Sequence, residues 1–428
     1  MSALLPWKIL HCELSEGLPD LDLVSGYGGL FVVFWWHGVP LGHKRIPAVQ
    51  LPMSADELSN YAIKAIAPAV CDQLIHQGGN SPLTEYFRNP KQEISTVLQT
   101  LPFMERPMAR LRENWLKLTN EAVCATVSVV ICTRGRPGHL LNCLKSLKRL
   151  SKQPNEIIVV DNDADSDEIH RLISKIPGVL YVKEPRPGLS TARNTGIRQS
   201  KSDIIAFTDD DVAVHPDWIL RLTQGFQNPK VMCVTGQVLP AELETESQVL
   251  FEIRRGGLSG AYRAKIFDQQ FFWKTQRIAA PVWKIGAGAN MAFRRQVFEQ
   301  IGFFDERLGV GAAGCSEDSE IWYRILAKGW SCRYEPTAVV YHYHRKELRS
   351  LKQQLHLYMS GHAAALLVQF SNHKHWGNLS RLFYFLPKYF MCLFFGALLR
   401  GFRGEHGLVL SEITGCVAGI KYYIKHRS

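Results

Sequence analysis

Short apolar runs alternate with segments of helical periodicity through the middle of the chain. Four apolar runs have the length of buried strands: Val127–Cys132, Glu156–Asp161, Val179–Val182 and Asp203–Thr208. Three segments with helical spacing lie among them: His139–Leu150, Asp165–Ile176 and Ser190–Gln199. Strands that alternate with helices of about ten residues form parallel sheets with right-handed crossovers. The pattern predicts an α/β fold, with a mostly parallel, Rossmann-like sheet flanked by helices.

The regions on either side have a different pattern, so we expect three domains: residues 1–120, 121–345 and 346–428. In the first, Leu30–Trp36 is typical of a buried strand, His37–His43 of a turn, and Ser54 of a helix N-cap. The turn histidines lack a third ligand nearby, which disfavours a metal site there. Residues 95–118 have roughly helical spacing, and the role of this module stays open.

The C-terminal region is helical, apolar and basic. A helical pattern follows Arg345 to about Phe370, and Leu382–Leu399 is nearly long enough to span a bilayer but is interrupted by Pro387 and Lys388. A weaker apolar stretch follows at Gly407–Ile424. From residue 345 to the end there are 12 Lys and Arg against 3 Asp and Glu, in a chain of net charge +11. We predict a tail bound to a membrane surface by aromatic and basic side chains, with a helical pair packed on the core as the alternative.

Cysteine usage and the N-terminus indicate the compartment. The ten cysteines are scattered without a C-x-x-C pair, which favours reduced thiols over a zinc site or disulfides. The first residues lack the charged start and long apolar core of a secretion signal. We therefore expect a cytoplasmic protein associated with the cytoplasmic membrane, and no nucleic-acid partner.

Three adjacent aspartates, Asp209, Asp210 and Asp211, directly follow the apolar run Ile204–Thr208. Adjacent carboxylates repel one another and raise one another's pKa unless a cation lies among them. Hard divalent cations such as Mg²⁺ and Mn²⁺ prefer carboxylate oxygen and leave positions open for phosphate oxygens. The stretch predicts a metal site at the end of a buried strand.

Other polar residues follow the neighbouring strands and should lie at the same edge of the sheet, where ligands of open α/β sheets bind. They are Thr133, Arg134 and Arg136 after the first strand and Asp161 at the end of the second. Arginines suit an anionic ligand, and a single acid suits a ribose hydroxyl or a base N–H. A simple polar turn is the alternative for Asp161.

A further anion site is expected at Pro187–Ile197. Here Ser190 is the expected N-cap, and the free N–H groups of a helix N-terminus suit phosphate. Arg193 adds a permanent positive charge. A purely structural ion pair between Arg193 and the aspartates is the alternative.

Four motifs in this order resemble the nucleotide-sugar domain of glycosyltransferase family 2: V-S-V-V-I-C-T-R-G-R-P, E-I-I-V-V-D-N, G-L-S-T-A-R-N-T-G-I and I-I-A-F-T-D-D-D. The resemblance covers Val127–His344, about half of the chain. It implies a GT-A fold and an inverting transfer from a nucleoside-diphosphate sugar, with a uridine or thymidine diphosphate donor. The membrane-directed tail favours a carbohydrate or lipid-linked acceptor and a role in cell-surface glycan or polysaccharide synthesis.

The resemblance also implies roles for single residues. The metal, Mn²⁺ or Mg²⁺, would be held by Asp211, Asp209 and His342, with His344 as the alternative to His342. Asp318 at the start of a helix running to about Ala327 would be the catalytic base, with Glu317 as the alternative.

The resemblance implies that further residues bind the donor. Asp210 and Asp161 would bind ribose and base, with Asp209 able to exchange roles with Asp210. The glycine-containing stretch Trp283–Phe293 resembles the sugar and acceptor segment of the family and offers Asn290 to the donor, with an ordinary glycine-containing strand as the alternative.

Two other functions stay open. A nucleotidyltransferase could use similar acids, although the chain lacks a glycine-rich, lysine-bearing loop after the first strand. A catalytically inactive sugar-nucleotide-binding or scaffold protein is the second. A processive polysaccharide synthase is disfavoured because no Q-x-x-R-W element follows Asp318.

Overall fold

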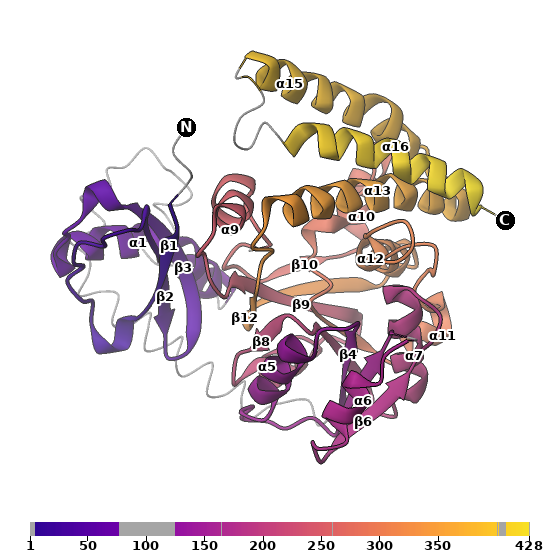
Figure 1. The fold of residues 1–428 in the computed structure, drawn as a ribbon, viewed down its shortest axis with the longest axis horizontal. Coiled ribbons are helices and arrows are strands. Elements are labelled where there is room, and N and C mark those ends of the chain that lie inside the picture. The colour runs from indigo at the N-terminus through magenta and orange to yellow at the C-terminus, as the bar shows by residue number, and fades with distance from the viewer. Residues whose placement is uncertain are drawn as a thin grey trace.

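A nine-stranded mixed sheet forms the centre of this computed structural model, which describes residues 5–76, 125–163, 165–258, 260–399, 401 and 408–427 (Figure 1). The order along the sheet is β10 (Lys265–Phe267), β12 (Ser331–His342), β9 (Val231–Pro240), β11 (Asn290–Arg294), β7 (Ile204–Asp209), β4 (Val127–Thr133), β5 (Glu156–Asp161) and β6 (Val179–Lys183), and β8 (Val212–Val214) pairs with β12. The expected helical stretch 95–118 lies outside the described residues.

The four expected strands are β4, β5, β6 and β7, and they pair in parallel. In this register Thr133 of β4 lies opposite Asp161 of β5, and Cys132 lies opposite Asp209 of β7. The ends of three strands therefore meet at one edge, as the sequence predicted. The α/β class with a mostly parallel sheet is confirmed, while β11 runs antiparallel to both β7 and β9.

Helices cover both faces of the sheet. One apolar core lies under α5 (Pro137–Leu147), α6 (Glu168–Ile173) and α8 (Trp218–Gln224). The opposite core lies under α7 (Leu189–Gln199), α11 (Val297–Ile301) and α12 (Glu317–Ala327). Helices α7 and α12 both begin at the edge where the polar strand ends meet, so their first turns belong to that edge.

The expected N-cap of α7 was wrong. The helix begins after Gly188, whose φ of 134° lies in a region that glycine adopts readily. The Ser190 hydroxyl instead donates to the carbonyl of Leu308 at 2.6 Å. This hydrogen bond ties the first turn of α7 to the loop that precedes α12.

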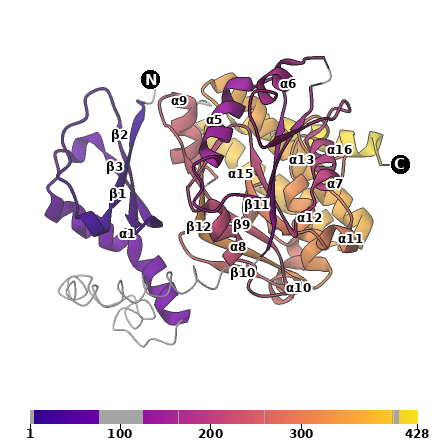
Figure 2. The same cartoon turned by 90° about the horizontal axis from the view of Figure 1, so that it is seen from below.

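The N-terminal module, residues 5–76, is a three-stranded sheet with one long helix (Figure 2). Its elements are β1 (Trp7–Glu13), β2 (Gly29–Trp36), β3 (Val39–Pro47) and α1 (Ala55–His76). The Ser54 side chain accepts from the Glu57 N–H at 3.3 Å, as expected of an N-cap. The expected turn His37–His43 is shorter than predicted, because His43 lies within β3.

The sheet of this module is buried on both faces. One face packs on α1, and the other presents Phe31, Val33 and Trp35 to Leu239 and Val339 of the central sheet. Strands β9 and β12 are therefore covered by the N-terminal module at their ends.

The C-terminal region is helical, as expected: α13 (Leu348–His373), α14 (Gly377–Ser380), the π-helical turn η6 (Arg381–Phe385), α15 (Leu386–Leu399) and α16 (Val409–Lys425). Helix α16 packs along α13, where Gly415 and Gly419 lie against the carbonyls of His356 and Ser360. Of the helices in the described ranges, none has the length and apolar character needed to cross a membrane.

Candidate active site

The three aspartates after β7 have different partners. Asp209 is partly exposed and pairs with Arg193, whereas Asp210 and Asp211 are buried. Arg136, in the loop after β4, reaches both buried carboxylates, at 3.1 Å to Asp210 and 2.8 Å to Asp211. Guanidinium groups from two other segments thus offset the repulsion within the aspartate triplet.

Asp210 is fully buried and has protein partners. Its carboxylate accepts from the Thr133 hydroxyl at 2.7 Å, and both side chains are almost completely buried. Burial, with the charges of Asp211 and Asp209, raises the pKa of Asp210 to about 7 against the opposing charge of Arg136. The geometry therefore gives no support to direct ribose binding by Asp210 or to donor binding by Thr133, and they hold β4 and β7 together.

Asp211 and Asp209 form a cluster with His342 that has the composition of a metal site. One potential ligand atom from each residue lies within 4.8 Å of the others, and His342 Nε2 is 3.5 Å from Asp211 Oδ1. Burial alone would raise the pKa of Asp211, but the guanidinium groups of Arg136 and Arg345 hold it below its usual value. Burial lowers the pKa of His342, which favours the neutral imidazole that binds metals.

This donor set fits the expected ion. Two carboxylates and one imidazole suit Mn²⁺ or Mg²⁺ with positions left for phosphate oxygens. Arg136 and Arg345 approach the same oxygen of Asp211, at 2.8 and 3.9 Å. An anionic ligand on the metal would thus find two guanidinium groups beside it.

Arg193 joins the aspartate cluster to the start of α12. Its guanidinium is buried and donates to Glu317 at 2.6 Å, to Asp209 at 3.3 Å and to the carbonyl of Gly288 at 3.3 Å. Glu317 is buried in this ion pair. The ion-pair alternative for Arg193 fits this geometry better than a phosphate contact.

Asp318 is the carboxylate of α12 that remains partly exposed. Its oxygens accept from the N–H of Gly288 at 2.9 Å and from the N–H of Ser319 at 2.6 Å. Burial and the charge of Glu317 raise the pKa of Asp318 to about 7, against the opposing charge of Arg193. A carboxyl group with this pKa can exchange a proton near neutral pH, as a general base must.

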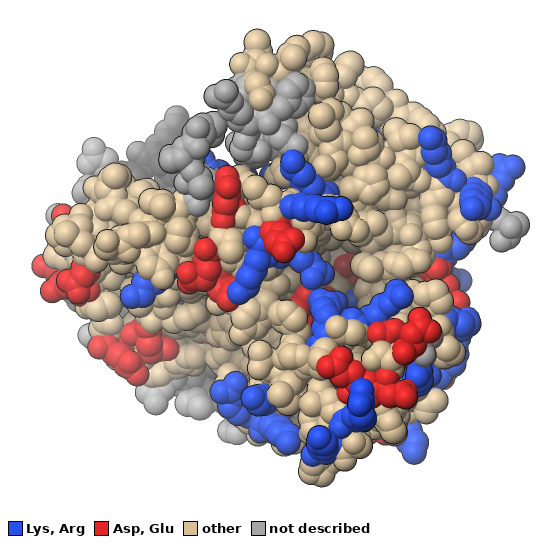
Figure 3. Space-filling model, viewed as in Figure 1, with Lys and Arg blue, Asp and Glu red and all other residues tan. Residues whose placement is uncertain are grey.

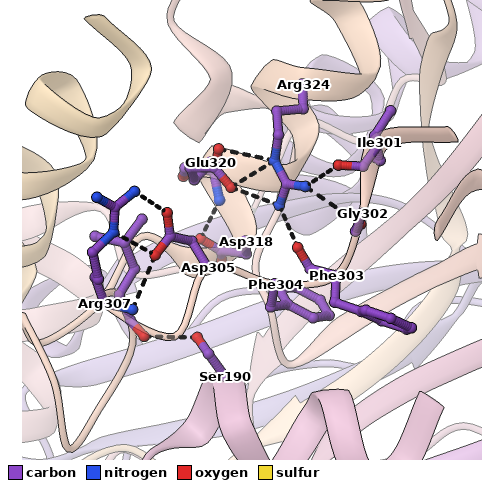
Figure 4. A network of polar contacts seen from close by, with 12 residues as sticks. Ser190, Ile301, Gly302, Phe303, Phe304, Asp305, Arg307, Asp318, Glu320 and Arg324 are labelled. Carbon is purple, nitrogen blue, oxygen red and sulfur yellow. Dashed lines mark hydrogen bonds and ion pairs between the residues drawn. The ribbon is translucent and has the colours of Figure 1, made fainter. Parts of the chain in front are cut away.

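The loop before α12 is fixed to the helix by a network of charged groups (Figure 4). Arg324 pairs with Glu320 at 2.8 Å and donates to the carbonyl of Phe303 at 2.8 Å. Asn194 of α7 donates to the carbonyl of Phe304 at 3.0 Å. The same loop therefore contacts both α7 and α12, the helices that carry Arg193 and Asp318.

The remaining expected donor-binding residues lie in different surroundings. Asp161 is buried at the same edge and accepts from the Tyr181 hydroxyl at 2.9 Å, and its pKa is raised by burial. Arg134 is exposed at this edge.

The amide of Asn290 lies in the core, fully buried. It donates to the carbonyls of Gln237 and Ala338 at 2.9 and 2.8 Å and accepts from Trp218 at 2.8 Å. All of these partners are protein groups that bind β11 to its neighbours. Direct contact of Asn290 with a donor therefore has no support from the geometry.

Two residues of the site were missed in the sequence. Arg345 follows the Y-H-Y-H run directly, and its position next to a candidate ligand could have indicated it. Glu252 contacts His344 at 3.0 Å, but it is separated from it by 92 residues and no local pattern indicates the contact.

Part of the chain matches a known protein family. Residues 128–302 match the family model described as Glycosyl transferase family 2. The chain therefore carries a glycosyltransferase family 2 domain, and the family resemblance of its sequence is confirmed.

Similar proteins include two glycosyltransferases and a protein of succinoglycan biosynthesis. A glucosyl-dolichyl phosphate glucuronosyltransferase of Haloferax volcanii is 25% identical over 43% of this chain and 57% of its own length. A pre-mycofactocin glycosyltransferase of Mycobacterium tuberculosis is 28% identical over 57% of this chain and 48% of its own. The succinoglycan biosynthesis protein ExoM of Rhizobium meliloti is 33% identical over 50% of this chain and 66% of its own length. The chain spans about half the length of the first two relatives.

A solved structure of the mannosyltransferase PcManGT from Pyrobaculum calidifontis, in complex with GDP-Man and Mn²⁺, is also similar. It is 17% identical, aligns with 78% of this chain and 99% of its own, and gives a TM-score of 0.46.

The candidate metal site formed by Asp209, Asp211 and His342 leads to a first prediction. Replacement of Asp211 with Asn should weaken Mn²⁺ binding by more than the roughly 10- to 100-fold that loss of an outer-shell partner costs. Calorimetric titration with Mn²⁺ measures this, with the exposed Asp167→Asn variant as the control. Equal Mn²⁺ affinity in the Asp211→Asn variant and wild type would contradict the assignment.

Proposed function

We propose that the protein is an inverting, metal-dependent glycosyltransferase that moves a sugar from a nucleoside-diphosphate sugar to an acceptor hydroxyl. The family 2 domain supplies the class, and the proposal adds the donor type, the metal and the stereochemistry. Its main support is that one buried guanidinium, Arg193, contacts both Asp209 of the metal cluster and Glu317 beside the candidate base Asp318. A metal-bound diphosphate and a proton acceptor would thus be neighbours in one site.

One group of residues would stabilise the departing diphosphate. A divalent ion held by Asp209, Asp211 and His342 would offset the charge that develops on the departing diphosphate. Arg136 and Arg345 are placed to stabilise the same charge.

The acceptor side would depend on α12. Asp318 takes the proton from the acceptor hydroxyl. At the same time the hydroxyl oxygen attacks the anomeric carbon from the face opposite the diphosphate. The single displacement needs no covalent intermediate and inverts the anomeric configuration. General-base help of this kind contributes about 10²–10⁴-fold.

The nucleotide would lie along the edge formed by the ends of β4 and β5. Asp161 is at this edge for the base or ribose, and Arg134 is exposed beside it. We propose a uridine or thymidine diphosphate sugar as the donor. The relatives named for dolichyl phosphate glycosylation and succinoglycan synthesis support a lipid-linked or carbohydrate acceptor in glycan synthesis.

A panel of sugar nucleotides tests the proposal. With Mn²⁺ present, the correct donor should raise the melting temperature most, because a ligand that binds only the folded state stabilises it by mass action. Product analysis should then find the transferred sugar with inverted configuration. Pyrophosphate release from a nucleoside triphosphate would support a nucleotidyltransferase, and absence of transfer or hydrolysis with every donor would support an inactive binding protein.

Asp318→Asn should reduce transfer by about 10²–10⁴-fold and leave donor affinity nearly unchanged, because it removes only the proton acceptor. Wild-type kcat/KM should rise as the pH increases through about 7, the pKa of Asp318, and level off above it, where Asp318 is deprotonated. The variant should lack this rise. Transfer at the wild-type rate, or an unchanged pH profile in the variant, would show that another group is the base.

We also propose that the C-terminal helices attach the protein to a membrane surface. Segment η6–α15 exposes a row of large apolar side chains: Phe383, Tyr384, Tyr389, Met391, Phe395, Leu398 and Leu399. The surface over α15 is mostly uncharged in the view of Figure 3. Lys388 on α15 and Lys421 and Lys425 on α16 are exposed and suit anionic headgroups.

Co-sedimentation with vesicles tests the attachment. Vesicles that contain phosphatidylglycerol should retain the wild-type protein, and high salt should weaken the binding. Phe395→Glu combined with Leu399→Glu should abolish retention, while Val49→Glu, an equally exposed apolar position on the N-terminal module, should not. Equal retention of the double variant would contradict this surface.

A further inference from the structure

A chain of buried polar contacts leads from the metal cluster into the interior. His342 Nε2 faces Asp211 at 3.5 Å, and His342 Nδ1 lies 3.1 Å from His344 Nδ1. His344 Nε2 in turn lies 3.0 Å from Glu252 Oε2. His344 and Glu252 are both buried, and the catalytic steps described above use neither of them.

The donor and acceptor roles along this chain follow from its last member. An ionised carboxylate only accepts hydrogen bonds, so Nε2 of His344 must carry a proton to bind Glu252. If each ring carries one proton, His344 accepts at Nδ1 and His342 carries its proton on Nδ1. The Nε2 lone pair of His342 is then directed at the metal position.

We propose that Glu252 is a positioning residue of the metal site, which acts through His344 to hold His342 in the tautomer whose Nε2 can bind a divalent cation. This inference rests on the metal-dependent function proposed above. Metal-bound histidines commonly donate their other N–H to an acceptor that fixes the ring, and here a second histidine and a buried carboxylate would serve as that acceptor.

The local backbone is shaped around the Glu252 carboxylate. Glu252 lies in the π-helical turn η3 (Leu250–Arg254), a rare conformation that is frequent at functional sites. Gly257 approaches so closely that a side-chain carbon at this position would overlap the Glu252 carboxylate. The absence of a side chain at Gly257 leaves the space that the Glu252 carboxylate occupies.

The N-terminal module holds this turn from the other side. Arg45 of β3 donates to the carbonyl of Ile253 at 2.6 Å and to that of Glu252 at 3.3 Å. His43 of the same strand contacts the Tyr262 hydroxyl at 3.1 Å. The module thus contributes to the metal site indirectly, by fixing the turn that carries Glu252.

Binding of Mn²⁺ alone tests the inference, measured by the electron paramagnetic resonance signal of the free ion. Glu252→Leu removes the acceptor and should weaken Mn²⁺ binding by about 10- to 100-fold, the usual cost of losing an outer-shell partner. Glu252→Gln keeps an oxygen acceptor and should have an affinity between those of wild type and Glu252→Leu. Glu335→Gln is the matched control, because Glu335 is a buried carboxylate on β12 whose partners are Arg333 and Thr337.

Two spectroscopic measurements separate positioning from a general effect on folding. Electron spin echo spectra of bound Mn²⁺ should show coupling to a histidine nitrogen in wild type and lose it in Glu252→Leu. Histidine nitrogen NMR should place the proton of His342 on Nδ1 in wild type. A proton on Nε2 of His342, or Mn²⁺ affinity and nitrogen coupling that survive in Glu252→Leu, would overturn the inference.

Arg45→Gln supplies an independent variant if Glu252→Leu does not fold, as judged by circular dichroism. It lies outside the central sheet, and it should weaken Mn²⁺ binding while Glu335→Gln does not; unchanged affinity would count against the inference. The two proposals can fail separately. Wild-type protein that binds Mn²⁺ through a histidine nitrogen but transfers no sugar refutes the function alone, and active wild type with an unaffected Glu252→Leu variant refutes the inference alone.

Discussion

Repulsion among three adjacent carboxylates is the constraint around which the site is built. Asp209, Asp210 and Asp211 are held at the end of one buried strand, where water cannot screen their charges fully. Arg136 and Arg193 reach them from separate segments of the chain. These charges are balanced only when several parts of the fold have formed: the sheet, the starts of two helices and the strand end at His342. The site therefore depends on the complete central fold.

Each element adds one property to this edge. The loop after β4 brings Arg136, α7 brings Arg193, and the end of β12 brings His342 with Arg345 just beyond it. The start of α12 brings Asp318, whose pKa of about 7 depends on burial and on the neighbouring charge of Glu317. The arrangement separates a side suited to a metal and phosphate oxygens from a side suited to proton transfer, as the proposed single displacement requires.

Local patterns in the sequence were sufficient to predict the parallel strands and the residues at their ends. Apolar runs defined β4, β5, β6 and β7, and parallel pairing brought Thr133, Asp161 and Asp209 to one edge. The family motifs indicated Asp318 and His342.

What the sequence could not indicate depended on contacts between distant segments. The Ser190 hydroxyl donates to the carbonyl of Leu308 and does not cap its own helix. The Asn290 amide donates to carbonyls of two other strands. In both cases the partner is distant in the sequence, so no local pattern indicates it. Glu252 reaches His344 across 92 residues, and such a contact leaves no periodic signal. The choice between buried and accessible aspartates also required the packed structure, since Asp210 and Asp209 are adjacent in sequence but differ in exposure.

The proposed catalysis requires Asp209, Asp211 and His342 to bind a divalent cation beside the donor diphosphate. This can be measured by anomalous diffraction at the manganese absorption edge, from crystals grown with Mn²⁺ and a nucleoside diphosphate. We expect one strong peak within bonding distance of His342 Nε2 and of both carboxylates, with Arg136 turned from Asp211 toward the diphosphate. A nucleotide bound at this edge with no manganese peak among these three residues would show that they do not form the metal site.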